Sequence, residues 1–187
     1  LGPNWKSHLK EMADYGTVMH LCAASWLTKK SIDSELFVYA EKRWKKGRQL
    51  RKDMLSFIRW VEEFDVVVIA VEAMVAWKPG YLSAPVVMAV DILCEMNLFT
   101  KNKVTVETDE VYQRGPQKGL VKMKEVTEVK ISRIKAIVDM KSNFDGKESK
   151  SYYESHKMQL MAQKQAVKES LGIEVTNLYN WSPNGWK

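Results

Sequence analysis

The stretch that decides the fold is Phe64-Asp65-Val66-Val67-Val68-Ile69-Ala70-Val71-Glu72-Ala73-Met74. Its Val and Ile residues form an almost unbroken apolar run, which predicts a strand buried on both faces of a sheet. The run ends at one carboxylate, Glu72. Because a buried charge is costly unless it is paired or binds a metal, Glu72 is a candidate functional residue. The alternative is that Glu72 is simply the first exposed residue beyond the strand.

The chain of 187 residues suits one domain over 1–187, with 171–187 as a C-terminal tail. Lys and Arg number 29 against 23 Asp and Glu, which gives a net charge of +6. Such a balance favours nucleic acid as a partner, with a membrane surface second. Two isolated cysteines, Cys22 and Cys94, predict neither a zinc site nor a secreted protein, and favour an intracellular, reducing compartment. We expect no membrane-spanning segment and no signal peptide, because no apolar run is long enough.

The remaining elements are predicted from periodicity and turn residues. Strands are expected at 15–28 and 103–112, and helices at 35–63, 83–96, 121–139 and 151–170. Alternating strands and helices predict an α/β fold with a sheet flanked by helices and partly parallel strands. Periodicity does not exclude that 64–76 is a buried helix, in which case the chain would be a mostly helical, basic interaction protein.

A dense basic segment lies within the helix predicted at 35–63. Seven cations lie between Glu41 and Asp53 with no acid among them: Lys42, Arg43, Lys45, Lys46, Arg48, Arg51 and Lys52. Such a run is often only a solvated helix face. Like charges four residues apart destabilise a helix, however, so contact with nucleic-acid phosphates is an equally good interpretation. Lys118, Lys122 and Lys124, around Gly119, form a second and weaker basic loop.

Glu154 and His156 begin the last predicted helix and are further candidates. An acid in a first turn commonly complements the helix dipole, which is the alternative explanation. If either residue faces Glu72, the groups could hold a pair of divalent ions for phosphodiester hydrolysis. His20 is predicted to be a structural residue in an apolar strand. The sequence contains no GxSxG, GxGxxG or GxxxxGK[ST], so serine catalysis and nucleotide cradling are not predicted.

The layout resembles the RuvC-like Holliday junction resolvases of the RNase H-like superfamily. The similarity lies in a basic helix that leads into a strand ending in Glu, here residues 57–72. Residues 104–112 occupy the place of the next strand. Residues 115–122, Gly-Pro-Gln-Lys-Gly-Leu-Val-Lys, occupy the place of the family's Lys- and Gly-bearing DNA-contact loop.

The resemblance implies an RNase H-like mixed sheet flanked by helices and a Mg- or Mn-dependent endonuclease with a two-metal site. The implied substrate is branched or double-stranded DNA such as a four-way junction, cleaved by a homodimer. The apolar face of the helix at 83–96 could be the dimer face or part of the core. The implied nucleic-acid contacts are Lys42, Arg43, Lys45, Lys46, Arg48, Arg51, Lys118 and Lys122.

The family's catalytic acids correspond unevenly to this chain. Glu72 matches the acid on the central strand, and Glu154 and His156 match the group that begins the C-terminal helix. The first acid would fall at Asn4, in the segment Leu1-Gly2-Pro3-Asn4. An amide carries no charge and would weaken a site for a hard cation. Asn4 therefore favours the alternative of a catalytically degraded relative that binds nucleic acid as a subunit of a nucleoprotein complex.

Overall fold

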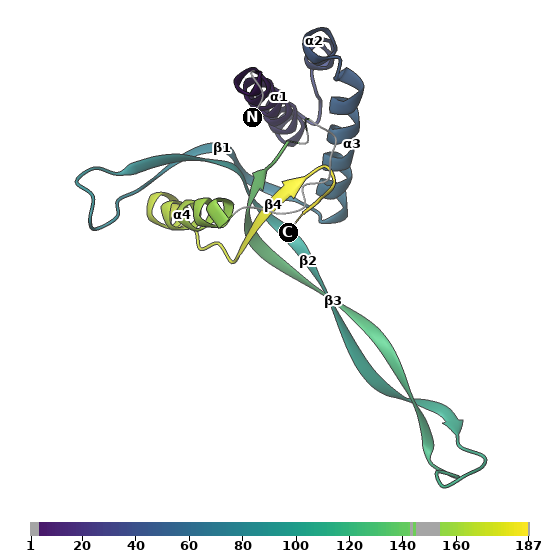
Figure 1. Cartoon of the computed structure of the whole chain (residues 1–187). Helices are drawn as coiled ribbons and strands as arrows, with labels where there is room; N and C mark the ends of the chain where they lie inside the picture. Colours follow the sequence, from purple (N-terminus) through teal and green to yellow (C-terminus); the bar gives the residue numbers. More distant parts are fainter. Residues whose placement is uncertain (1–3, 143, 145–153, 187) are drawn as a thin grey trace. The chain divides into compact units, whose positions relative to one another are not determined.

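The computed structural model describes residues 4–142, 144 and 154–186. The helices are α1 (Trp5–Lys29), α2 (Ser34–Trp44), α3 (Gly47–Glu63) and α4 (Glu154–Leu171) (Figure 1). The strands are β1 (Val67–Trp77), β2 (Val86–Val111), β3 (Val121–Met140), β4 (Asn177–Ser182) and β5 (Gly185–Trp186). The chain divides into two compact units, Leu1–Met96 with Ile134–Lys187, and Asn97–Arg133. Across the described ranges, no helix is long and apolar enough to cross a membrane.

The strands form one sheet in the order β1-β2-β3-β4-β5. β1 pairs antiparallel with β2, β4 pairs parallel with β3, and β5 pairs antiparallel with β4. The parallel pair is joined through α4, as a parallel connection requires a crossover. The predicted α/β class with a mixed sheet is therefore confirmed, and the RNase H-like arrangement stays a prediction.

Helices cover both faces of the sheet in the first unit (Figure 1). α1, α2 and α3 pack on one face, where the buried side chains include Tyr15, Met19, Leu50, Phe57, Ile92, Val138 and Trp181. α4 packs on the other face, where they include Val75, Val90, Leu93, Ile137, Leu160 and Val167. The alternation of Ile137 and Val138 between the two clusters follows from the two-residue period of a strand.

Residues 15–28, predicted as strands, belong instead to α1. The buried residues of α1 recur at three and four positions: Tyr15, Val18, Met19, Cys22, Ala23 and Leu27. This spacing is the apolar stripe of a helix. The strand prediction was wrong because the local composition is strand-like, whereas the helical period is visible only over a longer window.

The helix predicted at 35–63 is two helices, α2 and α3. Lys45 ends α2 with a φ of 60°, and Lys46 precedes α3. Gly47 begins α3 at a close approach of the two helices, since an added Cβ would lie 2.6 Å from the Phe37 carbonyl oxygen. The apolar stripe continues through the break, so periodicity alone gave no sign of it.

The helices predicted at 83–96 and 121–139 are wrong, because both segments belong to the long strands β2 and β3. Residues 90–94 are buried, and a short run that is apolar on every side fits a buried strand as well as a helix. Val90 and Leu93 of the proposed dimer face lie in the core. The strand predicted at 103–112 is part of β2, and the helix at 151–170 is confirmed as α4 over its described residues. The tail at 171–187 contributes β4 and β5 to the sheet.

The strand predicted at 65–74 is confirmed as β1, but it does not end at Glu72, since β1 continues to Trp77, and it is not buried on both faces. β1 lies at the edge of the sheet, and Val67 and Met74 are 51% and 67% exposed. One face of β1 is covered by α4, whose Ser170 hydroxyl donates to the Ala76 carbonyl oxygen at 2.9 Å. An edge strand can place a carboxylate where solvent and ligands reach it.

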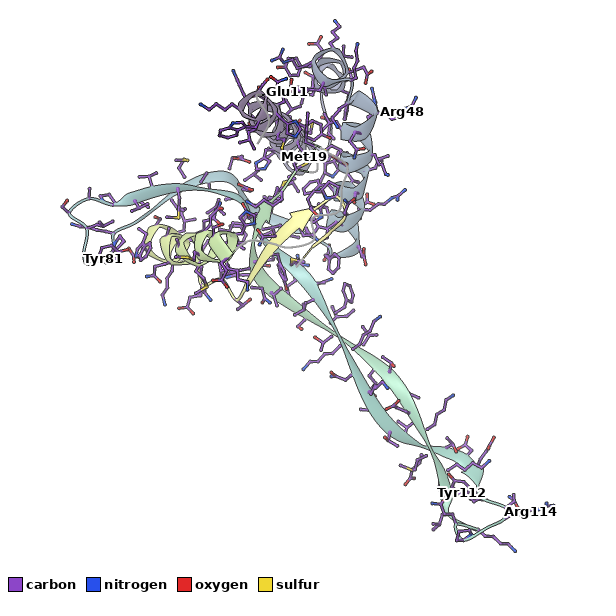
Figure 2. All side chains as sticks on the ribbon, in the orientation of Figure 1. Glu11, Met19, Arg48, Tyr81, Tyr112 and Arg114 are labelled. Atoms are coloured by element: carbon purple, nitrogen blue, oxygen red, sulfur yellow. The ribbon has the colours of Figure 1, made fainter. Side chains whose placement is uncertain are left out.

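The second unit, Asn97–Arg133, is a two-stranded ribbon made from the outer parts of β2 and β3, and we call it the arm. Tyr112 and Arg114 lie at its closed end (Figure 2). Two ion pairs join its strands, one between Lys103 and Glu125 (2.8 Å) and one between Lys122 and Glu110 (2.7 Å). Nearly all of its side chains are exposed or half-buried.

Candidate metal centre

Three potential metal ligands lie close together on three different elements. They are His20 of α1, Glu72 of β1 and Asp91 of β2, and one ligand atom from each lies within 4.8 Å of the others. The His20 Nδ1 atom is 3.2 Å from Glu72 Oε1, and its Nε2 atom is 3.8 Å from Asp91 Oδ2. The imidazole therefore sits between two carboxylates, with one nitrogen toward each.

The pairing of β1 with β2 places Glu72 beside Asp91. Val71 pairs with Ile92 and Ala73 pairs with Val90, so Glu72 and Asp91 are opposite each other on adjacent strands. Glu72 has a φ of 50°, which is rare for a residue with a Cβ and is costly inside a strand. Its side chain is 45% exposed, so the carboxylate reaches His20 and remains open to solvent. Strain of this kind is commonly kept at functional sites.

Asp91 is the buried carboxylate of the cluster, with 8% of its surface exposed. It accepts a hydrogen bond of 2.7 Å from the Met140 backbone N–H at the end of β3. Burial raises the pKa of Asp91 to about 6, against the opposing effects of His20 and of that hydrogen bond. Asp139 and Glu72 raise the pKa further, because their negative charges lie nearby. A cation at this point would relieve the repulsion.

The end of β3 adds a second buried acid and a lysine. Asp139 is 2% exposed, and its Oδ2 atom lies 2.6 Å from Lys141 Nζ. Gln159 of α4 donates to Asp139 Oδ1 at 3.4 Å. The Met140 carbonyl oxygen lies 3.2 Å from His20 Nε2, so the peptide between the two charged residues also faces the cluster. We call His20, Glu72, Asp91, Asp139 and Lys141 the carboxylate site.

His156 of α4 lies within electrostatic range of Asp139 and Lys141, while its predicted approach to Glu72 stays a prediction. Burial lowers the pKa of His156, and the charge of Lys141 lowers it further, while Asp139 acts in the opposite direction. These influences place the imidazole within electrostatic range of the Asp139–Lys141 pair. Glu154, two residues earlier in the first turn of α4, is exposed. Its position fits the dipole explanation.

Asn4 does not belong to the carboxylate site. It is the N-cap of α1 and lies sixteen residues before His20, which belongs to the same helix. At a rise of 1.5 Å per residue this separation is roughly 24 Å along the helix axis. The residues before it, 1–3, lie outside the described part of the chain.

The predicted nucleic-acid contacts fall into two groups. Lys42, Arg43, Lys45, Lys46, Arg48 and Arg51 lie around the junction of α2 and α3, and Lys118 and Lys122 lie in the arm. Some have structural partners. Lys46 donates to the Phe144 carbonyl oxygen and lies over its ring, and Lys122 pairs with Glu110. The exposed members, Lys42, Arg43, Lys45, Arg48 and Arg51, remain available to a ligand.

Glu72 is the one member of the carboxylate site that the sequence singled out. The incorrect strand prediction at 15–28 hid the position of His20 in α1. Asp91 lies inside the apolar run 86–94, the same signal that singled out Glu72. Asp139 and Lys141 follow the apolar pair Ile137-Val138, and residues two apart on a strand share a face. The false helices at 83–96 and 121–139 hid both signals.

Cysteine chemistry has little support in this structure. Cys22 and Cys94 are buried and form no disulfide. Burial raises the pKa of Cys22 to about 12, so the reactive thiolate is disfavoured.

Comparison with protein-family models, curated proteins and solved structures finds no match to the chain. Function is therefore inferred from the geometry of the site.

Proposed function

We propose that the chain is a metal-dependent phosphodiesterase that hydrolyses nucleic acid at the carboxylate site. The observation that carries this proposal is the convergence of His20, Glu72 and Asp91 within 4.8 Å, next to a buried aspartate that is paired with a lysine. Several acids gathered beside one another in a partly buried place are unfavourable unless a cation balances them. The strained φ of Glu72 supports a role beyond folding.

The donor atoms fit a hard divalent cation. Carboxylate and carbonyl oxygens suit Mg²⁺ and Mn²⁺, and an imidazole ligand tilts the preference toward Mn²⁺. His20, Glu72 and Asp91 would hold the ion, because their ligand atoms lie within 4.8 Å of one another. Asp139 adds negative charge nearby. Glu72, being half exposed, would bind the ion directly or through its water. When bound, the ion lowers the pKa of a water molecule and neutralises charge on a phosphate.

Lys141 would add a cationic side chain to the site. Its ammonium group is 2.6 Å from Asp139 Oδ2 and 27% exposed, so the charge lies at the edge of the site rather than inside the core. There it can donate to a non-bridging phosphate oxygen or to the attacking water, which stabilises the negative charge that grows in the transition state. Asp139 fixes the position of Lys141, and Gln159 in turn holds Asp139.

Nucleic acid is the substrate class that the charge of the chain favours. The net charge is +6, and the exposed cations near the α2–α3 junction suit a phosphate backbone. The resemblance stated from the sequence leads to more specific proposals. They are a RuvC-like relationship, a two-metal site, a branched DNA substrate and a homodimer. Of the four catalytic residues that the resemblance implied, Glu72 belongs to the group of potential metal ligands.

The test is a cleavage assay on single-stranded, double-stranded and four-way-junction DNA and on RNA, with Mg²⁺ or Mn²⁺. Asp91→Asn, Asp139→Asn and Lys141→Met should each lower the cleavage rate by at least about 100-fold, as expected for groups that act on the reacting phosphate. Glu154→Gln is the matched control, because Glu154 is an exposed acid nearby in the fold that the site does not use. It should cleave at the wild-type rate.

Two results would contradict the proposal. Wild-type rates in the Asp91→Asn and Asp139→Asn variants would assign the activity to another site or to a contaminant. Absence of cleavage on every substrate, together with no stabilisation by Mn²⁺, would favour the alternative of a non-catalytic subunit that binds nucleic acid.

A further inference from the structure

A pocket of about 440 Å³ opens where α2 meets α3. Its lining residues come from both helices and are Phe37, Val38, Glu41, Lys42, Gly47, Arg48 and Arg51. We call it the elbow pocket. Phe37 is 8% exposed and forms part of an apolar wall, while the charged groups are exposed. Figure 2 shows Arg48 on α3, with its side chain directed away from the helix. The size lies within the range of pockets that bind small ligands.

The elbow pocket is held in shape by the junction of the two helices. Glu41 Oε2 accepts a hydrogen bond of 2.9 Å from the Gly47 backbone N–H, so the last turn of α2 caps the start of α3. The Lys46 N–H bonds the Ala40 carbonyl oxygen at 3.2 Å. A Cβ on Gly47 would lie 2.8 Å from Glu41 Cβ, which shows how closely the helices approach. A preformed pocket loses little entropy when a ligand binds.

The lining of the elbow pocket combines positive charge with an aromatic group. Lys42, Arg48 and Arg51 contribute three positive charges against one negative charge from Glu41. In the described part of the chain, none of these three cations forms an ion pair with a carboxylate. The Arg51 guanidinium lies over the Phe37 ring, with 4.4 Å between Cζ and the ring centroid. A planar guanidinium held on a ring offers its free face to a nucleobase.

We propose that the elbow pocket binds one nucleotide of a nucleic-acid strand. Lys42 and Arg48 contact the phosphate, and the base stacks against the Arg51–Phe37 pair. The inference rests on the proposed function in so far as the strand is the substrate of the carboxylate site. A strand fits better than a purely anionic ligand, because the wall is apolar and aromatic while the charges lie at the mouth.

The test measures binding of a fluorescent single-stranded oligonucleotide in EDTA, where a metal-dependent cleavage reaction cannot occur. Lys42→Gln with Arg48→Gln should raise Kd at least about tenfold. This pair should also lower the slope of log K against log salt by roughly 0.7 to 1.4, the release expected from one or two phosphate contacts. Arg51→Lys keeps the charge but loses the plane, so it should raise Kd with little change of slope.

Arg43→Gln with Lys45→Gln is the matched control. These two cations come from the same basic segment and are exposed, but they do not line the pocket. An equal loss of affinity in the control pair would mean that only overall charge matters, and would overturn the proposal. Displacement of the oligonucleotide by micromolar nucleoside monophosphate would instead indicate a free-nucleotide site and would also overturn the assignment to a strand.

The failure of either proposal can be recognised separately. If the wild type cleaves nucleic acid and the Lys42 and Arg48 substitutions leave Kd unchanged, the elbow pocket is wrong and the carboxylate site stands. If these substitutions weaken binding while the wild type cleaves no substrate, the pocket stands and the phosphodiesterase proposal fails.

Discussion

Asp91 offers a test in which stability and metal binding change in opposite directions. Its pKa is raised from 3.8 to about 6, mainly by burial. The Asp91 carboxyl group therefore ionises less easily in the folded protein than in the unfolded chain. Above pH 6 it is ionised in both states, and the ionised form destabilises the fold. A shift of about two units at 1.36 kcal/mol per unit amounts to roughly 3 kcal/mol of lost stability at pH 7.5.

The sign of this effect fixes its pH dependence. Between pH 4 and pH 6 the unfolded chain releases the Asp91 proton while the folded protein keeps it, so rising pH favours unfolding. The loss of stability is complete above about pH 6 and falls to roughly 1 kcal/mol at pH 4.5. Asp91→Asn removes the charge. A buried amide that finds only part of its hydrogen bonds gives back about 1 kcal/mol, which leaves a net gain of about 2 kcal/mol at pH 7.5.

The assay is thermal unfolding in EDTA and in Mn²⁺, at pH 4.5 and pH 7.5. In EDTA at pH 7.5 the Asp91→Asn variant should melt about 4 to 8 °C above the wild type, and at pH 4.5 the gain should disappear. In Mn²⁺ at one hundred times its Kd the wild type should gain about 2.7 kcal/mol, and the variant should gain much less. A residue that lowers stability while it serves a site is a common compromise in proteins.

Asp53→Asn serves as the control, since Asp53 is also buried but accepts its hydrogen bonds from Tyr15 and Gln49. It should leave the Mn²⁺ effect unchanged. The reasoning is refuted if Asp91→Asn melts below the wild type in EDTA at pH 7.5, or if Mn²⁺ stabilises both proteins equally.

Three further predictions concern the fold. Tyr15→Phe removes the 2.7 Å hydrogen bond to the buried Asp53 carboxylate and should cost about 1–3 kcal/mol in urea unfolding; an unchanged midpoint would show that Asp53 does not need this donor. Gly47→Ala places a Cβ 2.6 Å from the Phe37 carbonyl oxygen and should destabilise the chain by about 1–3 kcal/mol, whereas Gly80→Ala, where no atom lies within 4 Å, should cost less. Replacing 102–128 by an Asn-Gly turn should leave the main thermal transition within about 2 °C, because the arm is a separate compact unit; loss of that transition would show that the first unit depends on the arm.

The sequence predicted the α/β class because its two strongest periodic signals were correct. The run at 64–74 contains most of β1, and the stripe at 35–63 covers α2 and α3. It could not give the place of β1 in the sheet, since an edge strand covered by a helix has much the same composition as a central strand. The exposure of Val67 and Met74 depends on which segments pair with β1, and that is a long-range property.

The candidate site was only partly predictable for a related reason. Glu72 was visible because it interrupts an apolar run, and Asp91 interrupts the run at 86–94 in the same manner. The second signal is ambiguous, because a short buried apolar run fits a helix as well as a strand. His20 gave no local signal, because its importance comes from the packing of α1 beside β1 and the end of β3.

The register of β2 with its neighbours explains how the site can coexist with the long arm. The arm begins at residue 97, six positions after Asp91, and ends at residue 133, six positions before Asp139. The positions of Asp91 and Asp139 therefore depend on the inner part of each strand. There the Met140 N–H donates a hydrogen bond of 2.7 Å to Asp91. Adding or removing the same number of residues in both strands of the arm leaves this pairing intact. A one-residue slip inside 91–96 would turn Asp91 to the opposite face and separate it from Glu72 and His20. The geometry of the site therefore depends on the register of the inner strands and not on the length of the arm.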